Sequence, residues 1–594
     1  MTHKPILGAV FVLTALLLPV VCRAGKGPER YFTIEVVDEQ TKRGVPLVEL
    51  RTVNEVRYYT DSAGLVAFYE PGLMDRDVFF YVTSHGYAFP KDGFGMRGKR
   101  LRTRPGGTGQ IRIKRTNIAE RLYRITGQGI YRDTVLVGRQ PPTRKPVLNG
   151  RVLGQDSVMA LPYRGKIHWF WGDTNRESYP LGQFAMSGAT SQLPAQGGLD
   201  PSVGVDLAYF VDDEGFSRKM APLPEHGMVW LDGFLTLPDD SGRERLVAHY
   251  GLMKSLGERL EHGLMVLSDE KEVFERLLRL ADDVRLHPQG QALRVTTGGQ
   301  AYWYFAQPYP FIRVKANWKD WRDPAAYEAF TCLAPGSDYE KDAPSLDRGP
   351  HGRLIWGWKR NTAVLDAKQQ AELVASGKLK ADEAWIGLRD AGTGKALVAH
   401  RASVHWNAFR RRWIMILCEF WGTSALGEIW YAEADKPEGP WRRARKIVTH
   451  EKYSFYNPAH HPFFDQEGGR IIYFEGTYTK AFSGAAVATP RYDYNQIMYR
   501  LDLADRRLAL PTPGPRGEES AERLFQIPSP LAGEGRVRGI SGLIHGLSPS
   551  PHPSPMKGEG VLSGRVRVFQ MGSAAGSDPP RTFCRTVCHQ QEMR

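Results

Sequence analysis

Two aspartates near residue 160 have the type and spacing that acid–base chemistry needs. Residues 157–161 and 167–171 are short apolar stretches, separated by a turn over 163–166 that contains a glycine. In an antiparallel hairpin the residue before the first strand and the residue after the second lie at the same edge, so we expect Asp156 and Asp173 to be neighbours. Neighbouring carboxylates titrate apart, which suits acid–base or nucleophilic work on a glycosidic bond. The alternative is that one aspartate is a turn residue and the other caps a loop.

Hairpins of the same kind recur between residues 148 and 510. Each has an apolar strand, a turn of polar or glycine residues, and a return strand rich in aromatic and β-branched residues. The further copies cover 228–250, 292–305, 403–420 and 461–475. Five such units of about four strands each predict an all-β fold over residues 148–510, namely a five-bladed β-propeller.

Hairpin geometry selects two polar positions in each unit, at the start of the innermost strand and at the end of the next. In the second, fourth and fifth units, these positions hold Asp232 with His249, His405 with Glu419, and His461 with Glu475, respectively. The third unit offers Arg294 and Gln307 and no acid. A ring of acids and histidines around a propeller axis would form a funnel for acid–base chemistry. The alternative is that these side chains hydrogen-bond to one another or to a central water or ion.

The ends of the chain have their own composition. Residues 1–24 combine a basic start, an apolar run and a small-residue cleavage site, which predicts an export signal and a secreted or periplasmic protein. An uncleaved membrane anchor is the alternative; after signal removal we expect no stable membrane span. Residues 511–594 are rich in Pro, Gly and Ser, which predicts a disordered tail.

Residues 30–115 have the alternation of short strands, and residues 116–147 are predicted to be a linker that ends in a proline-rich stretch. Three stretches occur in order, a Gly-Val-Pro-Leu strand at 44–47, a Thr-Asp-Ser-Ala-Gly turn at 60–64 and a Ser-His-Gly-Tyr end at 84–87. This order resembles the carboxypeptidase-regulatory, transthyretin-like domains of exported bacterial enzymes. The resemblance implies a small β-sandwich that serves as an accessory module without catalytic residues.

Charge and cysteine content narrow the classes of partner. The chain has 79 Lys and Arg against 65 Asp and Glu, a net charge of +14, which is compatible with binding to an acidic polysaccharide or a membrane surface, while a solvated surface is the first interpretation. The basic residues are scattered and belong to no nucleic-acid motif, so we expect no nucleic-acid partner. Cys332 and Cys418 lie in the folded body, as one disulfide or two buried thiols. No zinc spacing is present and no cofactor is required, although a structural cation at the propeller axis is an option.

Four motifs carry a second resemblance. They are Gly-Gln-Asp-Ser at 154–157, Trp-Gly-Asp-Thr at 171–174, the strand and Gly-Pro-Trp turn at 431–441, and Tyr-Asn-Pro-Ala-His-His-Pro-Phe at 456–463. Together they resemble the five-bladed propeller glycoside hydrolases, in the neighbourhood of families 43 and 117 and the arabinan-cleaving propellers. The resemblance implies hydrolysis of a polysaccharide or oligosaccharide by paired carboxylates.

The resemblance also implies roles for individual acids. Asp156 would be the general base or nucleophile, Asp173 its partner as acid or pKa modulator, and Asp232 a further aspartate from the second blade. The acidic glutamate that such enzymes take from the third blade has no counterpart here, so one of four other side chains would have to replace it: Glu419, Glu475, His405 or His461. A carboxyl separation of about 5 Å would imply retention of configuration, and roughly 6.5–9.5 Å inversion.

Aromatic and basic side chains are the candidates for holding substrate. The substrate-binding set is Trp230, Trp406 and Trp421 as stacking platforms, Arg176 and Arg360 for a substrate carboxylate or sulfate, and His405 and His461. Packing between blades and ordinary surface solvation are the alternatives for these residues. Two other functions stay open, a non-catalytic carbohydrate-binding propeller and a polysaccharide lyase that would use one of the two histidines with a tyrosine.

Overall fold

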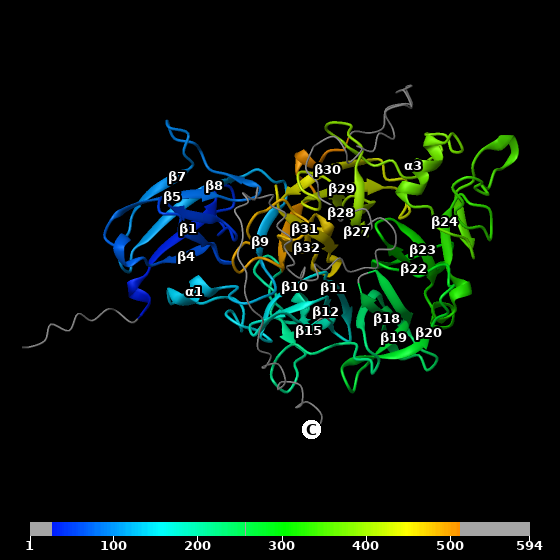
Figure 1. The fold of residues 1–594 in the computed structure, drawn as a ribbon, viewed down its shortest axis with the longest axis horizontal. Helices are drawn as coiled ribbons and strands as arrows, with labels where there is room; N and C mark the ends of the chain where they lie inside the picture. The colour runs from blue at the N-terminus through cyan, green and yellow to red at the C-terminus, as the bar shows by residue number, and fades with distance from the viewer. Residues whose placement is uncertain (1–26, 184, 256, 511–594) are drawn as a thin grey trace, which may run out of the picture. The chain divides into compact units, whose positions relative to one another are not determined.

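The computed structural model describes residues 27–183, 185–255 and 257–510, and β-strands dominate it, which confirms the all-β prediction (Figure 1). The predicted export signal and the predicted tail lie outside the described residues. The α-helices are short: α1 (Arg132–Leu136), α2 (Trp318–Arg322) and α3 (Ala367–Ala375). None of the helices in the described ranges is long and apolar enough to cross a membrane.

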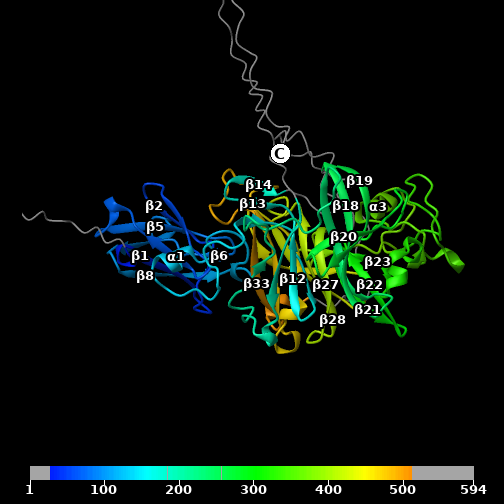
Figure 2. The same cartoon turned by 90° about the horizontal axis from the view of Figure 1, so that it is seen from below.

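Two four-stranded sheets form the N-terminal part. One has the order β4-β1-β8-β6 and the other β3-β2-β5-β7, and Figure 2 shows them as two layers. Their strands are β1 (Phe32–Asp38), β2 (Glu49–Thr52), β3 (Arg57–Tyr59), β4 (Leu65–Phe68), β5 (Asp77–Thr83), β6 (Tyr87–Ala88), β7 (Gly98–Arg102) and β8 (Thr108–Arg115). Alternate residues of β8 point inward, so Ile111 and Ile113 join Ile34, Leu50 and Phe80 in one apolar core between the layers.

The first four-stranded sheet after the N-terminal part contains the predicted aspartate hairpin. Its strands are β11 (Met159–Tyr163), β12 (Lys166–Trp171), β15 (Ser187–Gln192) and β16 (Ala208–Tyr209). Arg164 and Gly165 both have positive φ, as a two-residue turn between twisted strands requires. A three-stranded sheet adjoins the hairpin's open end, with β10 (Val152–Gln155), β13 (Thr174–Arg176) and β14 (Tyr179–Gln183).

Three further sheets follow in sequence order. The second is β17 (Met228–Pro238), β18 (Glu244–Ser255), β19 (Glu258–Ser268) and β20 (Val273–Arg279). The third is β21 (Gln291–Thr297), β22 (Gln300–Ala306), β23 (Pro310–Lys315), β24 (Glu328–Thr331) and β25 (Gly357–Arg360). The fourth is β27 (Val398–Asn407), β28 (Arg412–Phe420), β29 (Glu428–Ala434) and β30 (Arg443–Thr449), with β26 (Arg389–Asp390) at its edge.

The last sheet draws a strand from far back in the chain. Its order is β31 (Ser454–His460), β32 (Ile471–Thr479), β33 (Asn495–Asp502) and β9 (Glu120–Arg124). β9 lies within residues 116–147, which the sequence predicted to be a linker. All five residues are buried, so buried and exposed positions do not alternate along the strand, and its partner strand is more than 300 residues away in the sequence. Neither feature gives a local strand signal.

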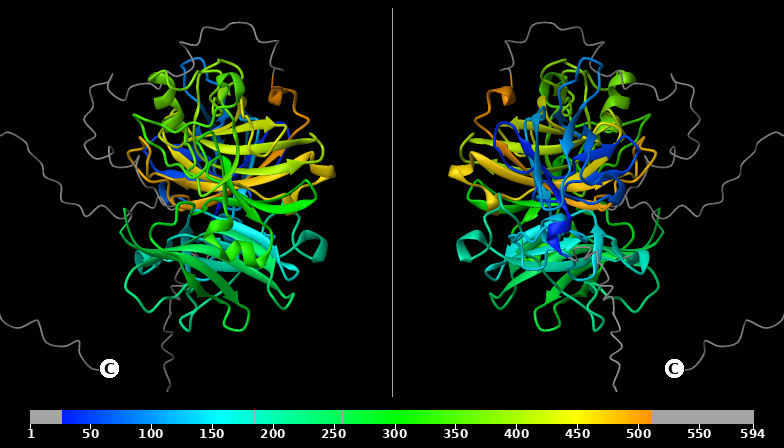
Figure 3. Two further views of the ribbon diagram at one scale, coloured as in Figure 1. Left: turned by 90° about the vertical axis from the view of Figure 1, so that its right-hand side faces the viewer. Right: turned by 90° about the vertical axis from the view of Figure 1, so that its left-hand side faces the viewer.

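The five sheets contact one another in a closed cycle. β11 lies against β17, β17 against β21, β21 against β27, and β27 against β31; the succession runs from cyan to orange in Figures 1 and 3. The last sheet returns to the first, because the Tyr456 hydroxyl donates to Asp156 Oδ2 at 2.7 Å and Asn457 Nδ2 donates to Ser157 Oγ at 2.7 Å. First strands therefore face one another across a common centre.

The two cysteines of the folded body are free and buried, which decides between the alternatives left by the sequence. Burial raises the pKa of the Cys332 thiol to about 12 and that of Cys418 well above its ordinary value. Both thiols are therefore held in the unreactive protonated form.

Arg121 of β9 ties the N-terminal sheets to the last sheet. It is 1% exposed, and its guanidinium donates to the carbonyls of Pro46 and His85 at 3.1 Å each, as well as to Ser84. We expect Arg121→Ala to lower the free energy of unfolding by about 3 kcal/mol, because buried acceptors lose a charged donor. Urea unfolding would measure it. Arg112→Ala is the matched control, since Arg112 is exposed on β8 and bonds only to Gln110; it should cost less than about 0.5 kcal/mol. Equal losses would contradict this reading of Arg121.

Candidate active site

Asp156 and Asp173 lie side by side at the open end of the β11–β12 hairpin. The Gly172 amide donates to the Asp156 carbonyl at 2.8 Å, and Gln155 of β10 faces Thr174 of β13 in the next register pair. Both aspartates are buried, with 0% and 1% of their surface exposed. The proximity expected from the hairpin is therefore found, in an interior setting.

The residues next to the two aspartates in the sequence are fixed by a network of side-chain hydrogen bonds. Gln155 donates to Ser187, and its side-chain oxygen accepts from the Tyr209 hydroxyl at 2.7 Å. Thr174 donates to the same serine at 2.8 Å. Gln155 and Thr174 are thus occupied in fixing the backbone that carries the aspartates.

Two tyrosines from the last sheet face this pair. Tyr456 donates its hydroxyl hydrogen bond to Asp156, and Tyr494, in the loop before β33, is also hydrogen-bonded to Asp156. Burial first, and then the negative charges of Asp156 and Asp173, raise the pKa of both phenols well above the ordinary value. Sequence reasoning did not select either tyrosine, because no local spacing links them to the hairpin.

Backbone strain is concentrated where the first and last sheets meet. Ser157, Asn457 and Tyr494 have φ values of 55°, 50° and 60°, a region that side-chain-bearing residues rarely adopt. The Ser157 amide donates to Thr477 Oγ1 at 2.9 Å, which helps to hold this conformation. Gly154 permits the close approach, since a Cβ there would lie 2.4 Å from the Tyr494 carbonyl oxygen. This explains the glycine of the Gly-Gln-Asp motif.

Asp232 forms a second acidic centre with a cation that sequence reasoning missed. Its Oδ1 accepts from the Gly290 and Gly233 amides at 2.7 and 2.9 Å, and its Oδ2 lies 3.9 Å from Arg401 Nη1. Burial raises the pKa of Asp232, and Arg401 and the two amides oppose that shift. Gly290 stands at the start of the third sheet, where the sequence offered no acid.

A hollow opens beside Asp232. It is small, about 10 Å³, and lies between Trp230, Asp232, Arg259, His287 and Gln289, among others. Trp230 is a wall of this hollow and is only 4% exposed, whereas Arg259 is an exposed cation at the same place.

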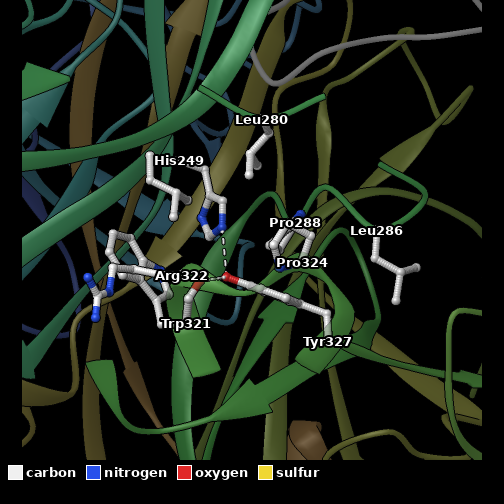
Figure 4. A pocket seen from close by; sticks show the side chains of 9 residues that line it. His249, Leu280, Leu286, Pro288, Trp321, Arg322, Pro324 and Tyr327 are labelled. Carbon is white, nitrogen blue, oxygen red and sulfur yellow. Dashed lines mark hydrogen bonds between the residues drawn. The ribbon is translucent and has the colours of Figure 1, made fainter. Parts of the chain in front are cut away.

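His249 lines this hollow and also a second, closely packed site between Leu280, Trp321 and Tyr327 (Figure 4). Its Nε2 lies 3.1 Å from the Tyr327 hydroxyl, which itself donates to the Trp321 carbonyl at 2.8 Å. The hydroxyl proton is thus used, so His249 Nε2 is the donor. His249 faces Asp232 in the strand register, as predicted.

Glu419 does not pair with His405, and this expectation was wrong. β27 begins at Val398 rather than at residue 403, so Glu419 faces Ala399 and His405 faces Ile414, nearer the turn. Glu419 accepts from Trp430 Nε1 at 2.8 Å and lies 3.6 Å from Lys395 Nζ. Burial raises the pKa of Glu419.

The inner strand of the last sheet was also predicted at the wrong position. Its inner strand is β31, which carries Tyr456, whereas residues 462–464 form a short turn of helix. Pro458 sits at a bulge of β31, and a proline there looks like a turn in the sequence. His461 does contact Glu475, with Nε2 2.7 Å from Oε1, but its ring packs against Trp169 in the apolar core.

The remaining substrate-binding candidates do not meet at one place. His405 packs its ring 5.1 Å from that of His460. Arg176 is paired with Glu214 at 3.1 Å and covers the Phe216 ring, and Arg360 is on the outermost strand of the third sheet, 3.7 Å from Glu328. Trp406 is 51% exposed near the β27–β28 turn, whereas Trp421 is 60% exposed and follows Glu419 at the other end of the hairpin. Of the tryptophan candidates, Trp230 lies two residues before Asp232 on the same strand and Trp421 lies two residues after Glu419.

A cation at the centre of the cycle finds no ready ligand set. Within residues 27–183, 185–255 and 257–510, no group of three or more His, Cys, Asp or Glu side chains is arranged to hold a metal ion.

Comparisons with known proteins found solved structures only: no family model and no curated protein matches the sequence. Similar structures include the GH43_1 enzyme from Xanthomonas citri complexed with xylotriose, at 13% identity and a TM-score of 0.30, over 61% of this chain and 91% of that one. An exo-1,5-α-L-arabinanase from a bovine ruminal metagenomic library gives 10% and 0.29, over 59% and 94%. A putative exo-β-1,3-galactanase from Bifidobacterium bifidum gives 8% and 0.28, over 65% and 94%. With TM-scores this low, we base the function on the chain's own residues.

His400, which precedes Arg401, should make the free energy of unfolding depend on pH. Burial lowers the pKa of His400 to about 3, so the folded protein excludes a proton that the unfolded chain binds below about 6.5. This histidine therefore reduces stability as the pH falls from about 6.5 towards 3, by about 1.4 kcal/mol per pH unit. We expect the stability gap between the wild type and His400→Gln, measured by urea unfolding, to shrink by about 2 kcal/mol between pH 6.5 and 5. A gap that is constant with pH would contradict a buried neutral His400.

Proposed function

We propose that this chain is an exported glycoside hydrolase that cleaves a polysaccharide or oligosaccharide with the Asp156–Asp173 pair. The single observation that supports this most is the pair itself: two adjacent, buried carboxylates, with two tyrosines of another sheet turned towards one of them. Paired carboxylates in such a setting are the usual means of hydrolysing a glycosidic bond.

The architecture we propose is a five-bladed β-propeller over residues 148–510, preceded by a transthyretin-like β-sandwich over 30–115. The closed cycle of five antiparallel sheets supports the propeller, and the shared core of the two N-terminal sheets supports the sandwich. β9 would close the ring by completing the last blade with a strand from before the first. Export rests on residues 1–24, and the disordered tail on the composition of residues 511–594.

The two aspartates divide the work in this proposal. Asp156 accepts hydrogen bonds from Tyr456 and Tyr494, which orient the carboxyl group that attacks the anomeric carbon or activates a water. Asp173 protonates the departing glycosidic oxygen. Either route breaks the C–O bond and adds one water across it, and the anomer released, followed by NMR, would distinguish retention from inversion.

The other acids support this pair. Asp232, with Arg401, places a charged centre beside the hollow, and Trp230 forms one of its walls. Exposed Arg259 favours a substrate with an acidic group, in keeping with the basic chain. Glu419 beside Trp421 is a further acid for substrate contact, while the bond of Glu475 to His461 gives it a packing role.

Asp156→Asn and Asp173→Asn test the proposal. We expect each to lower kcat by about a thousandfold or more on the polysaccharide that the wild type cleaves, because each removes a reacting group. Release of new reducing ends from a panel of neutral and acidic polysaccharides is the measurement, with circular dichroism to verify folding. Asp213→Asn, at an exposed position, is the matched control and should retain wild-type activity.

Other outcomes would replace the hydrolase. An unsaturated, ultraviolet-absorbing product would establish a lyase, although His405 and His461, the histidines it would use, have ring partners in the interior. Binding to one polymer without product, undiminished in Asp156→Asn, would establish a binding propeller.

A further inference from the structure

The loop Arg491–Asn495 brings Tyr494 to Asp156. The same loop is held in place by hydrogen bonds to residues of the N-terminal part. Tyr492, two residues before Tyr494, points the other way and is buried. Its hydroxyl donates to the Thr60 carbonyl at 2.5 Å and accepts from the Leu47 amide at 3.2 Å. Both partners belong to the first 115 residues, outside the cycle of five sheets.

Residues next to Tyr492 make further contacts that hold the loop in place. Arg491 Nη1 lies 3.2 Å from Asp133 Oδ2, and the other oxygen of Asp133 accepts from the Ala67 amide of β4 at 3.0 Å. The guanidinium of Arg124, at the end of β9, lies 4.9 Å from the centre of the Tyr492 ring. The loop is thus held by a carbonyl, an amide, a carboxylate and a cation, all from residues before 148.

The conformation of the loop requires such support. Arg491 and Tyr494 have φ values of 64° and 60°, so two side-chain-bearing residues within four positions occupy the left-handed region. Residues in that region persist where surrounding contacts over-determine them. The Tyr492 hydroxyl supplies two of these contacts on the N-terminal side of Tyr494.

We propose that Tyr492 is a positioning residue of the active site, through which the N-terminal sheets hold Tyr494 against Asp156. The N-terminal module is then a structural part of the catalytic centre rather than an appended accessory. This inference rests on the proposed function for its activity readout, but the placement of Tyr494 is testable without it.

The groups that face Asp156 define the effect to measure. They are Tyr456 from β31, Tyr494 from the loop before β33, and Asp173 after β12, with Asp493 further off beside Tyr456. Tyr494 donates to the carboxyl that must react, so its displacement should lower kcat and leave substrate binding little changed.

Tyr492→Phe keeps the ring and removes the hydroxyl. We expect kcat to fall about tenfold with KM within about twofold of the wild type. Tyr494→Phe should give at least the same loss of kcat. In the double variant Tyr492→Phe/Tyr494→Phe, the first substitution should add nothing further to the loss of kcat.

Tyr123→Phe is the matched control. Tyr123 of β9 is also buried and also donates to a backbone carbonyl, that of Pro201 at 2.6 Å, away from the loop. It should lose comparable stability in urea and leave kcat unchanged. The proposal is overturned if Tyr492→Phe behaves like Tyr123→Phe, or if its loss of kcat persists in full when Tyr494 is already Phe.

A fluorine NMR measurement on the full chain labelled with 3-fluorotyrosine separates this proposal from the proposed function. The Tyr494 resonance is identified as the one missing from Tyr494→Phe, and we expect it to shift in Tyr492→Phe and to stay in Tyr123→Phe. If the wild type cleaves nothing, these shifts still test the placement of Tyr494. A Tyr494 resonance that is unchanged in Tyr492→Phe would refute the positioning role.

Discussion

The contact between the last sheet and the first is the constraint on which the rest of the structure depends. Tyr456 reaches Asp156 and Asn457 reaches Ser157, each at 2.7 Å, between residues 300 positions apart. Without this seam the cycle of sheets would be open and would have no closed centre. The candidate catalytic pair sits on the seam, so the closure of the fold and the assembly of the site are one event.

Burial of ionisable groups is the cost of this arrangement. Desolvation raises the pKa values of Asp232, Glu419 and Glu475 and lowers those of His249 and His400. Each acid has a partner that offsets part of the penalty, namely Arg401, Trp430 or His461. Among these acids, Asp232 is the one that lines a hollow, although that hollow is small.

The N-terminal sheets bear on the site through two segments. β9 completes the last sheet, and its Arg121 binds the carbonyls of the N-terminal loops. The loop around Tyr492 reaches the same loops from the other side. A module that the sequence presents as separable is therefore joined to the sheet that carries Tyr456 and lies next to Tyr494.

Local patterns in the sequence determined the strands, the hairpin turn at Gly165 and the nearness of Asp156 to Asp173, because a hairpin is set by residues close in the chain. Asp232 opposite His249 was predictable for the same reason. The tertiary structure alone decided the partners from other sheets, Tyr456, Tyr494 and Arg401, and the place of β9, because these depend on contacts across long sequence separations. It also moved the starts of β27 and β31, where bulges interrupt the alternation that sequence patterns rely on, and so separated His405 from Glu419.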